Sequence, residues 1–192
     1  MKGMVIKMNV MLTSCGLETK AIETRFLKML KKSPEKAKAI FIPTAANSAG
    51  AIEVLPKCLN DLLKCGIKSE NIFIYDLYDS LTEEFLKQYD IIYLCGGSPE
   101  YLLRRINEGG FDKRLNAFIE RDGLVIGVSA GSIIFAENLP NHLNLLPCVL
   151  DVHCEKEQCE KPGEYDINEK KRIRLGNEQA ILFENNKIII ME

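Results

Sequence analysis

The segment GLVIGVSAGSIIF, residues 123–135, joins an apolar, strand-like run to a helix-like run through a group of small residues. A plain strand-to-helix turn accounts for this pattern. A nucleophile elbow does so too, because small residues on either side of a serine let the backbone fold tightly and leave the hydroxyl exposed. The pattern lies directly after a strand-like run and before a helix-like one, which is the context that an elbow requires. We therefore favour Ser129 as a nucleophile, with the plain turn as the alternative.

Similar apolar runs recur along the chain and alternate with helix-like segments. Each run is short, rich in Ile, Val, Phe or Tyr, and bounded by Gly, Pro, Asn or Asp, as expected for strands buried on both faces. The predicted strands are residues 4–12, 38–43, 71–77, 90–97 and 123–129.

The segments between these strands have helical periodicity. Residues 18–32 and 51–66 each place apolar residues on one face with charges opposite, and Pro56 is expected near the first turn of the second segment. Residues 98–109 begin with a serine cap followed by a proline at the first helical position. Alternating strands and helices predict a mostly parallel sheet with helices on both faces.

The last third of the chain departs from this alternation. We interpret residues 141–153 as one more strand with its entry loop, 154–172 as a charged, solvated excursion, and 180–192 as an antiparallel hairpin. The expected fold class is therefore α/β, a three-layer α/β/α sandwich whose mostly parallel sheet ends in an antiparallel edge hairpin. The length suits a single domain over residues 1–192.

Composition and charge restrict the classes of partner. With 25 Lys and Arg residues against 27 Asp and Glu residues, the chain has no broad electrostatic attraction to nucleic acid or to an anionic membrane. No apolar run approaches the ~20 residues that span a bilayer. We expect neither nucleic acid nor a membrane as a partner, and a monomer or a homodimer, since two-fold dimers are the commonest assembly.

The N-terminus and the cysteines predict a compartment. Lys2 and Lys7 interrupt the first apolar segment, which also lacks a small-residue cleavage site and so does not resemble a secretory signal. The seven cysteines are odd in number, and several lie within apolar runs, which suits a reducing environment better than a disulfide framework. A cytoplasmic location is expected.

Three predicted strands end in distinctive loops. In an open parallel sheet the carboxyl ends of the strands share one edge, where ligands bind. The loops expected at this edge are residues 43–47, 96–99 and 127–131. Their convergence supports a site there more strongly than any single motif does.

A serine nucleophile needs a base, and the chain contains only two histidines. His142 lies in a loop-like stretch between prolines, whereas His153 follows a predicted strand that could end at the same edge, so we select His153. The base should in turn be oriented by an acid or an amide. Glu137 is the first candidate for this role, and Asp151 is the second because it would point to the same side of an extended strand as His153.

The oxyanion that forms when a serine attacks a carbonyl needs backbone N–H donors. Ala130, at the start of the following helix, and Gly97, in a turn without an obstructing side chain, are the candidates. Gly96 and Ser98 flank Gly97 and are expected to contact the substrate. A plain strand-to-helix connection is the alternative for this glycine loop.

A metal site is the competing interpretation of Asp151, His153, Cys154 and Cys159. Their spacing fits the usual structural zinc patterns poorly, since two of them are adjacent and the chain has no Cys-x-x-Cys pair. We therefore predict no metal.

Taken together, these segments resemble the serine peptidase family that contains dipeptidase E (α-aspartyl dipeptidase) and cyanophycinase, relatives of the class I glutamine amidotransferases with their flavodoxin-like fold. The resemblance rests on FIPTAA at 41–46, YLCGGSPEYLL at 93–103, GLVIGVSAGSIIF at 123–135, LNLLPCVLDVH at 143–153 and, more faintly, LGNEQAILFENNK at 175–187. It implies Ser129 as nucleophile, His153 as base, and Gly97 and Ala130 at the oxyanion positions. It also implies cleavage of peptide bonds next to aspartate, without a metal or an organic cofactor.

Two departures from the family pattern bear on these roles. The interval from Ser129 to His153 lacks the loop that commonly carries the triad acid, so Glu137 is assigned by exclusion. Ser98 and Pro99 stand where relatives often have polar pairs. We expect a serine hydrolase of the dipeptidase E type acting on small peptides. The alternatives are an amidase or esterase of other specificity on the same scaffold, and a catalytically silent binding or regulatory relative.

Overall fold

The computed structural model describes residues 8–192 and contains an eight-stranded mixed sheet with the strand order β3-β2-β4-β5-β1-β9-β10-β7. Every neighbouring pair from β3 to β1 is parallel, and every pair from β1 to β7 is antiparallel. The strands are β1 (Val10–Thr13), β2 (Ala39–Ile42), β3 (Ile72–Ile74), β4 (Ile91–Leu94), β5 (Leu124–Val128), β7 (Gly163–Asp166), β9 (Ala180–Glu184) and β10 (Lys187–Met191). The first predicted strand, 4–12, begins outside the described residues.

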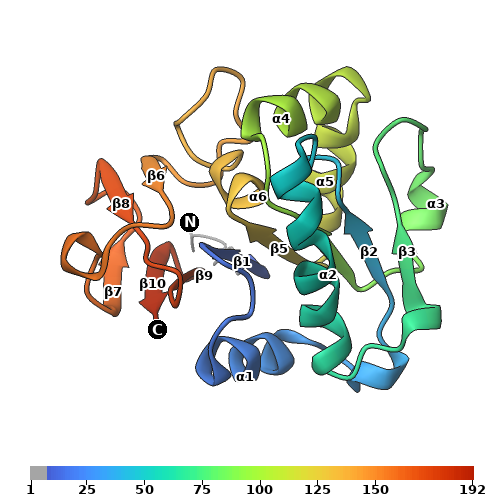
Figure 1. Cartoon of the computed structure of the whole chain (residues 1–192), viewed down its shortest axis with the longest axis horizontal. Helices are drawn as coiled ribbons and strands as arrows, with labels where there is room; N and C mark the ends of the chain where they lie inside the picture. Colours follow the sequence, from blue (N-terminus) through green and yellow to red (C-terminus); the bar gives the residue numbers. More distant parts are fainter. Residues whose placement is uncertain (1–7) are drawn as a thin grey trace, which may run out of the picture.

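Helices cover both faces of the parallel half of the sheet (Figure 1). The helices are α1 (Lys20–Met29), α2 (Ala49–Lys64), α3 (Glu83–Leu86), α4 (Pro99–Glu108), α5 (Phe111–Glu120) and α6 (Ala130–Ile133), with 3-10 turns at Pro34–Lys36, Ser69–Asn71 and Lys156–Gln158. The predicted α/β sandwich with a mostly parallel sheet is confirmed. Helices α3 and α5 were not among the predicted elements.

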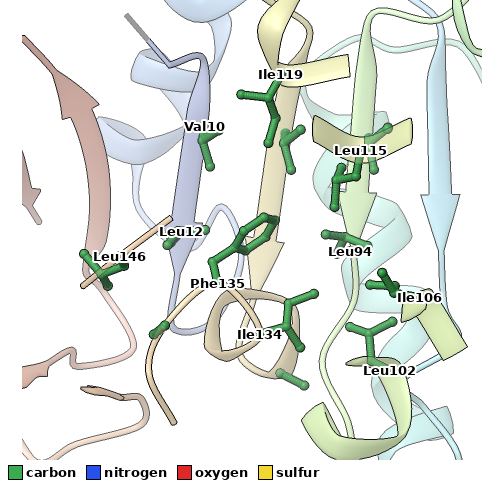
Figure 2. Close-up of a cluster of buried hydrophobic side chains, with 14 of the residues drawn as sticks. Val10, Leu12, Leu94, Leu102, Ile106, Leu115, Ile119, Ile134, Phe135 and Leu146 are labelled. Atoms are coloured by element: carbon green, nitrogen blue, oxygen red, sulfur yellow. The ribbon is translucent and has the colours of Figure 1, made fainter. Parts of the chain in front are cut away.

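Two clusters of buried hydrophobic side chains lie on the two faces of the sheet, because alternate residues of each strand point to opposite faces. On one face, Met11 and Ile126 pack with Ile22 of α1 and Leu62 of α2. On the other face, strand residues such as Val10, Leu12 and Leu94 pack with α4, α5 and α6, and Figure 2 shows Phe135, just after α6, among them. The central strands β1, β2, β4 and β5 are buried along their whole length, as predicted.

Two local predictions need correction. Strand β3 forms the edge of the sheet and not its interior, so Phe73 is 38% exposed and Ile74 is 60% exposed. Helix α2 begins at Ala49 with Ser48 as its cap, which places Pro56 inside the helix and not in its first turn. The Ser48 cap starts the helix before the apolar periodicity becomes visible in the sequence.

The C-terminal third differs most from expectation. The predicted hairpin is confirmed as β9 and β10, joined by Asn185 and Asn186 with positive φ, the backbone of a tight hairpin turn. The predicted solvated excursion 154–172 instead supplies β7, which pairs with β10. The strand predicted within 141–153 is β6 (Val149–Asp151), which pairs with β8 (Arg172–Arg174) in a separate two-stranded sheet. Within residues 8–192, no helix has the length and apolar character needed to cross a membrane.

Candidate active site

Ser129 occupies a sharp turn between β5 and α6. Its backbone has φ 50° and ψ −108°, a conformation that side-chain-bearing residues rarely adopt and that is typical of a strained elbow. Gly127 and Gly131 must be glycine because backbone atoms of other residues lie where a Cβ would be. A Cβ on Gly127 would lie 2.4 Å from the Gly131 carbonyl oxygen, and one on Gly131 would lie 2.3 Å from the Leu94 oxygen. The small residues of the motif therefore let α6 pack tightly against β4 and β5.

Strand β1 holds this turn in place. The Ser129 backbone N–H donates to the Thr13 carbonyl oxygen at 3.0 Å, and the buried Ser132 hydroxyl donates to the same oxygen at 2.8 Å. The Thr13 hydroxyl in turn donates to the Gly127 carbonyl oxygen at 3.1 Å. The elbow is thus fixed by three hydrogen bonds to a strand that lies far away in the sequence.

His153 lies beside the elbow. Its Nε2 is 2.9 Å from the Ser129 Oγ, which is hydrogen-bond distance. The residue has φ 59°, and its backbone N–H donates to the Ser14 hydroxyl at 2.8 Å. The end of β1 therefore anchors both partners, the serine through Thr13 and the histidine through Ser14. The other histidine, His142, lies elsewhere, with its Nδ1 2.9 Å from the Leu139 carbonyl oxygen.

Asn177 occupies the position at the far side of the His153 ring. Its Oδ1 lies 2.7 Å from the His153 Nδ1. Because an amide oxygen only accepts hydrogen bonds, Nδ1 carries the proton in this arrangement and Nε2 is free to accept the serine proton. The side chains thus form the series Ser129, His153 and Asn177, in which an amide stands where a serine triad commonly has an acid.

Neither acid proposed from the sequence contacts the His153 ring, which corrects that expectation. Glu137 is exposed after α6, and its backbone N–H donates to the Cys148 carbonyl oxygen. Asp151 accepts two hydrogen bonds from Arg172, at 2.6 and 2.9 Å. The argument from strand alternation fails because β6 ends at Asp151 and the positive φ of His153 turns its side chain away from the direction that an extended strand would give it.

Of the two candidate oxyanion donors, Ala130 directly follows Ser129, and Gly97 lines the same cavity as Ser129. Ala130 is the first residue of α6, so its N–H has no partner within the helix. Gly97 has φ 140°, and a Cβ there would lie 2.0 Å from the Ala45 carbonyl oxygen, so this position requires glycine. Within residues 8–192 neither amide donates a hydrogen bond, which leaves both available to an oxyanion.

The remaining two loop candidates have different environments. A Cβ on Gly96 would lie 3.8 Å from the Ser129 Oγ, so Gly96 borders the nucleophile directly. Ser98 instead caps α4, because its hydroxyl accepts the Tyr101 N–H at 3.2 Å and also lies 3.2 Å from the Glu100 carboxylate. It is not among the residues that line the cavity described next.

A cavity of about 400 Å³ opens beside Ser129 and His153. Its lining residues come from the end of β1, from α2, and from the loops after β4 and β5: Ser14, Cys15, Ala51, Val54, Leu55, Lys57, Cys58, Asp61, Gly96, Gly97, Val128, Ser129 and His153. The volume lies at the lower end of the ~300–1,000 Å³ that small-molecule sites enclose.

The ionisable groups of this cavity are largely paired with one another. The Lys57 Nζ lies 2.8 Å from the Glu18 carboxylate and 3.7 Å from the Cys15 sulfur, and this ion pair raises the pKa of Lys57. Burial raises the pKa of the Cys15 thiol, which keeps it neutral. A hydrogen bond from the Cys95 thiol lowers the pKa of Cys58.

The Asp61 carboxylate lines the cavity and is buried. One oxygen accepts the Tyr93 hydroxyl at 2.7 Å and the Leu17 N–H at 2.9 Å, and the other lies 3.1 Å from the Lys64 Nζ. Burial, with the nearby Asp61 charge, raises the pKa of Tyr93 well above its usual range, so Tyr93 remains a hydrogen-bond donor. Asp61 is therefore fully engaged by protein groups.

The cysteine and histidine group considered as a metal site has another arrangement. Cys159 donates to the backbone carbonyl of Glu155 at 3.1 Å, and Cys154 lies near the Val152 carbonyl oxygen. In the part of the chain that the structure describes, no three His, Cys, Asp or Glu side chains converge in a way that could hold a metal ion.

Sequence reasoning missed two residues of this site, Ser14 and Asn177. Ser14 follows β1, so it was detectable as one more strand end at the shared edge of the sheet. Asn177 lies in the loop before β9, within the faintest segment of the family resemblance, and no local pattern marks it as a partner of His153. Only the folded chain brings the two together.

An elbow serine hydrogen-bonded to a histidine, at the carboxyl edge of a parallel sheet, is the arrangement of the α/β serine hydrolases. The sequence matches the model of peptidase family S51 over residues 10–145. The chain therefore belongs to peptidase family S51 and is a serine-type peptidase, which confirms the resemblance drawn from its motifs. The matched region contains the elbow and the glycine loop but ends before His153 and Asn177.

Solved structures with a similar fold include two peptidases. A candidate peptidase E protein from Listeria monocytogenes is 23% identical, with a TM-score of 0.69 over 97% of this chain and 98% of that one. A peptidase from an acI-B1 Actinobacterium is 16% identical, with a TM-score of 0.68 over 98% of this chain and 88% of that one. No curated protein sequence matches the chain.

Proposed function

We propose that the protein hydrolyses short peptides through an acyl-enzyme on Ser129, with His153 as the base and the whole chain as one peptidase domain. The observation that carries this proposal is the 2.9 Å separation of the His153 Nε2 and the Ser129 Oγ at a strained elbow. A serine hydroxyl becomes an effective nucleophile when a correctly oriented base accepts its proton. The hydrogen bond to Asn177 supplies that orientation.

The steps follow from these positions. His153 takes the Ser129 proton as Oγ attacks the peptide carbonyl, and the resulting oxyanion lies against the N–H groups of Gly97 and Ala130. The imidazolium then gives its proton to the departing amine, which leaves an ester on Ser129. A water molecule, deprotonated by His153, hydrolyses this ester and restores the serine.

The family resemblance points to aspartate next to the bond that is cleaved. Lys57 is the one Lys or Arg side chain among the cavity-lining residues that the structure describes, and it would have to exchange its ion pair with Glu18 for one with such an acidic group. Aspartyl dipeptides are therefore the first substrates to assay. Simple esters assayed beside them separate a peptidase from an esterase on the same scaffold.

A fluorophosphonate probe tests the nucleophile without knowledge of the substrate. We expect the wild-type protein to be labelled at Ser129, the Ser129→Ala variant to remain unlabelled, and the His153→Ala variant to react far more slowly. His142→Ala is the matched control and should react at the wild-type rate, since His142 contacts Leu139 and not the elbow. Equal labelling of the two histidine variants would contradict the proposal.

A further inference from the structure

One face of α2 changes its environment along the helix. Apolar residues recur along α2 at the spacing of a single helical face, from its first turns to its last. In the second half this face is buried against the sheet, where Leu62 and Cys65 belong to the core. In the first half the same face, formed by Ala51, Val54 and Leu55, lines the cavity beside Ser129 instead.

This first half of the face is incompletely covered. Val54 lines the cavity and is 48% exposed. Val128, which is buried, and Gly96 line the same cavity. An apolar group in this space would contact α2 in the way that the sheet contacts the second half of the helix.

The polar groups of the cavity do not offset this apolar character. The Asp61 carboxylate is fully engaged by Tyr93, Leu17 and Lys64, so it presents no free charge. Lys57 is already paired with Glu18. The Cys15 thiol is neutral because burial raises its pKa. A charged side chain placed against α2 would lose hydration without gaining an unpaired partner there.

We infer that the wall formed by Ala51, Val54 and Leu55, named here the α2 wall, is a subsite for an apolar side chain next to the scissile bond, of about the size of Leu or Met. The inference rests on the proposed function, since the subsite is defined by its position beside Ser129. For an aspartyl dipeptide, the α2 wall would receive the side chain of the other residue. Removing the apolar area of one such side chain from water favours binding, at roughly 25 cal/mol per Å².

A matched set of dipeptides tests this subsite. One position is kept constant while the other carries Ala, Leu, Met, Ser or Lys, and kcat/KM is measured with each position varied in turn. We expect Leu and Met to exceed Ala by about tenfold or more at one of the two positions, as burial of an aliphatic side chain predicts. Equal values for Ala, Leu and Lys at both positions would overturn the inference.

Two variants of α2 provide a matched pair. Val54 and Ile52 are both exposed apolar residues of the same helix, at 48% and 54%, but only Val54 lines the cavity. We expect Val54→Asp to lower the ratio of kcat/KM for the leucyl substrate to that for the alanyl substrate about tenfold, while Ile52→Asp leaves this ratio unchanged. Equal effects of both variants, or none from Val54→Asp, would overturn the inference.

Binding measurements separate this inference from the proposed function. Titration calorimetry of the Ser129→Ala variant with the same dipeptides measures how much the α2 wall contributes to binding affinity, without requiring turnover. If fluorophosphonate labelling and hydrolysis occur without a preference for Leu, the subsite is wrong and the function stands. If the wild-type protein is neither labelled nor active, but binding prefers Leu and Val54→Asp removes that preference, the function is wrong and the subsite stands.

Discussion

The parallel half of the sheet and the C-terminal third contribute to the site in different ways. The parallel half carries Ser129 on a turn between a fully buried strand and a helix, tied to β1 by hydrogen bonds. The C-terminal third supplies His153 and Asn177, which are exposed and belong to segments between short strands. The comparison teaches that Ser129, the proposed nucleophile, follows directly on a core strand, whereas His153, the proposed base, is attached to the core through a few polar contacts, such as the one to Ser14.

The largest expected effect comes from removing either catalytic partner. Ser129→Ala should lower kcat on the best peptide substrate by about 10⁴-fold or more, and His153→Ala should cost nearly as much, because the two residues act as a unit. The double variant should be no slower than either single variant. Additive losses, measured by steady-state kinetics, would contradict a shared mechanism.

Gly131→Ala tests how rigidly the core holds the elbow. The added Cβ would lie 2.3 Å from the Leu94 carbonyl oxygen, so we expect the free energy of unfolding to fall by about 1–3 kcal/mol. Gly50→Ala is the matched control, because nothing lies within 4 Å of its Cβ position in α2. Since alanine favours a helix over glycine, this variant should be more stable by ~0.5–1 kcal/mol. Denaturant unfolding of the two variants measures both changes.

Asn177 tests the polar attachment of the base. Asn177→Ala removes the acceptor of the His153 Nδ1–H, and a hydrogen bond of ~0.5–1.5 kcal/mol corresponds to a loss of about 3–10-fold in kcat/KM. Asn177→Asp should retain or raise activity, because a carboxylate stabilises the imidazolium more strongly than an amide does. Glu178→Ala, in the same exposed loop, is the control and should leave kcat/KM unchanged. An unchanged kcat/KM in Asn177→Ala as well would contradict a role for Asn177 in orienting His153.

Ser98 should give the smallest effect on activity. Its hydroxyl caps α4, so Ser98→Ala should cost about 1 kcal/mol of stability while kcat/KM stays within about twofold. Thermal unfolding and peptide assays of one preparation distinguish this role from substrate contact. A large rise in KM with unchanged stability would restore Ser98 to the substrate site.

The contrast between the two regions also explains which predictions succeeded. The parallel strands, the turn at Ser129 and the Ser98 cap of α4 each leave a local pattern of apolar, small or capping residues, so they could be predicted from the sequence. The hydrogen bonds from β1 that hold the turn in place leave no such pattern. Strand β7 was missed because its exposed, charged residues are held at the sheet edge by pairing with β10 and not by burial. The argument that placed Asp151 beside His153 assumed an extended strand, and the positive φ of His153 invalidated it.

The sequence by itself determined the alternating α/β architecture and the small-residue turn at Ser129, because both follow from local apolar periodicity or from the spacing of small residues. It also predicted His153 in preference to His142 as the base, from the position of His153 after a predicted strand. Only the tertiary structure decided which group orients the base, and what surrounds the nucleophile. Asn177 meets His153, and the α2 wall lines the same cavity as Ser129, through contacts between segments far apart in the chain. Such contacts leave no local pattern, since they depend on how the layers pack together and not on the propensities of neighbouring residues.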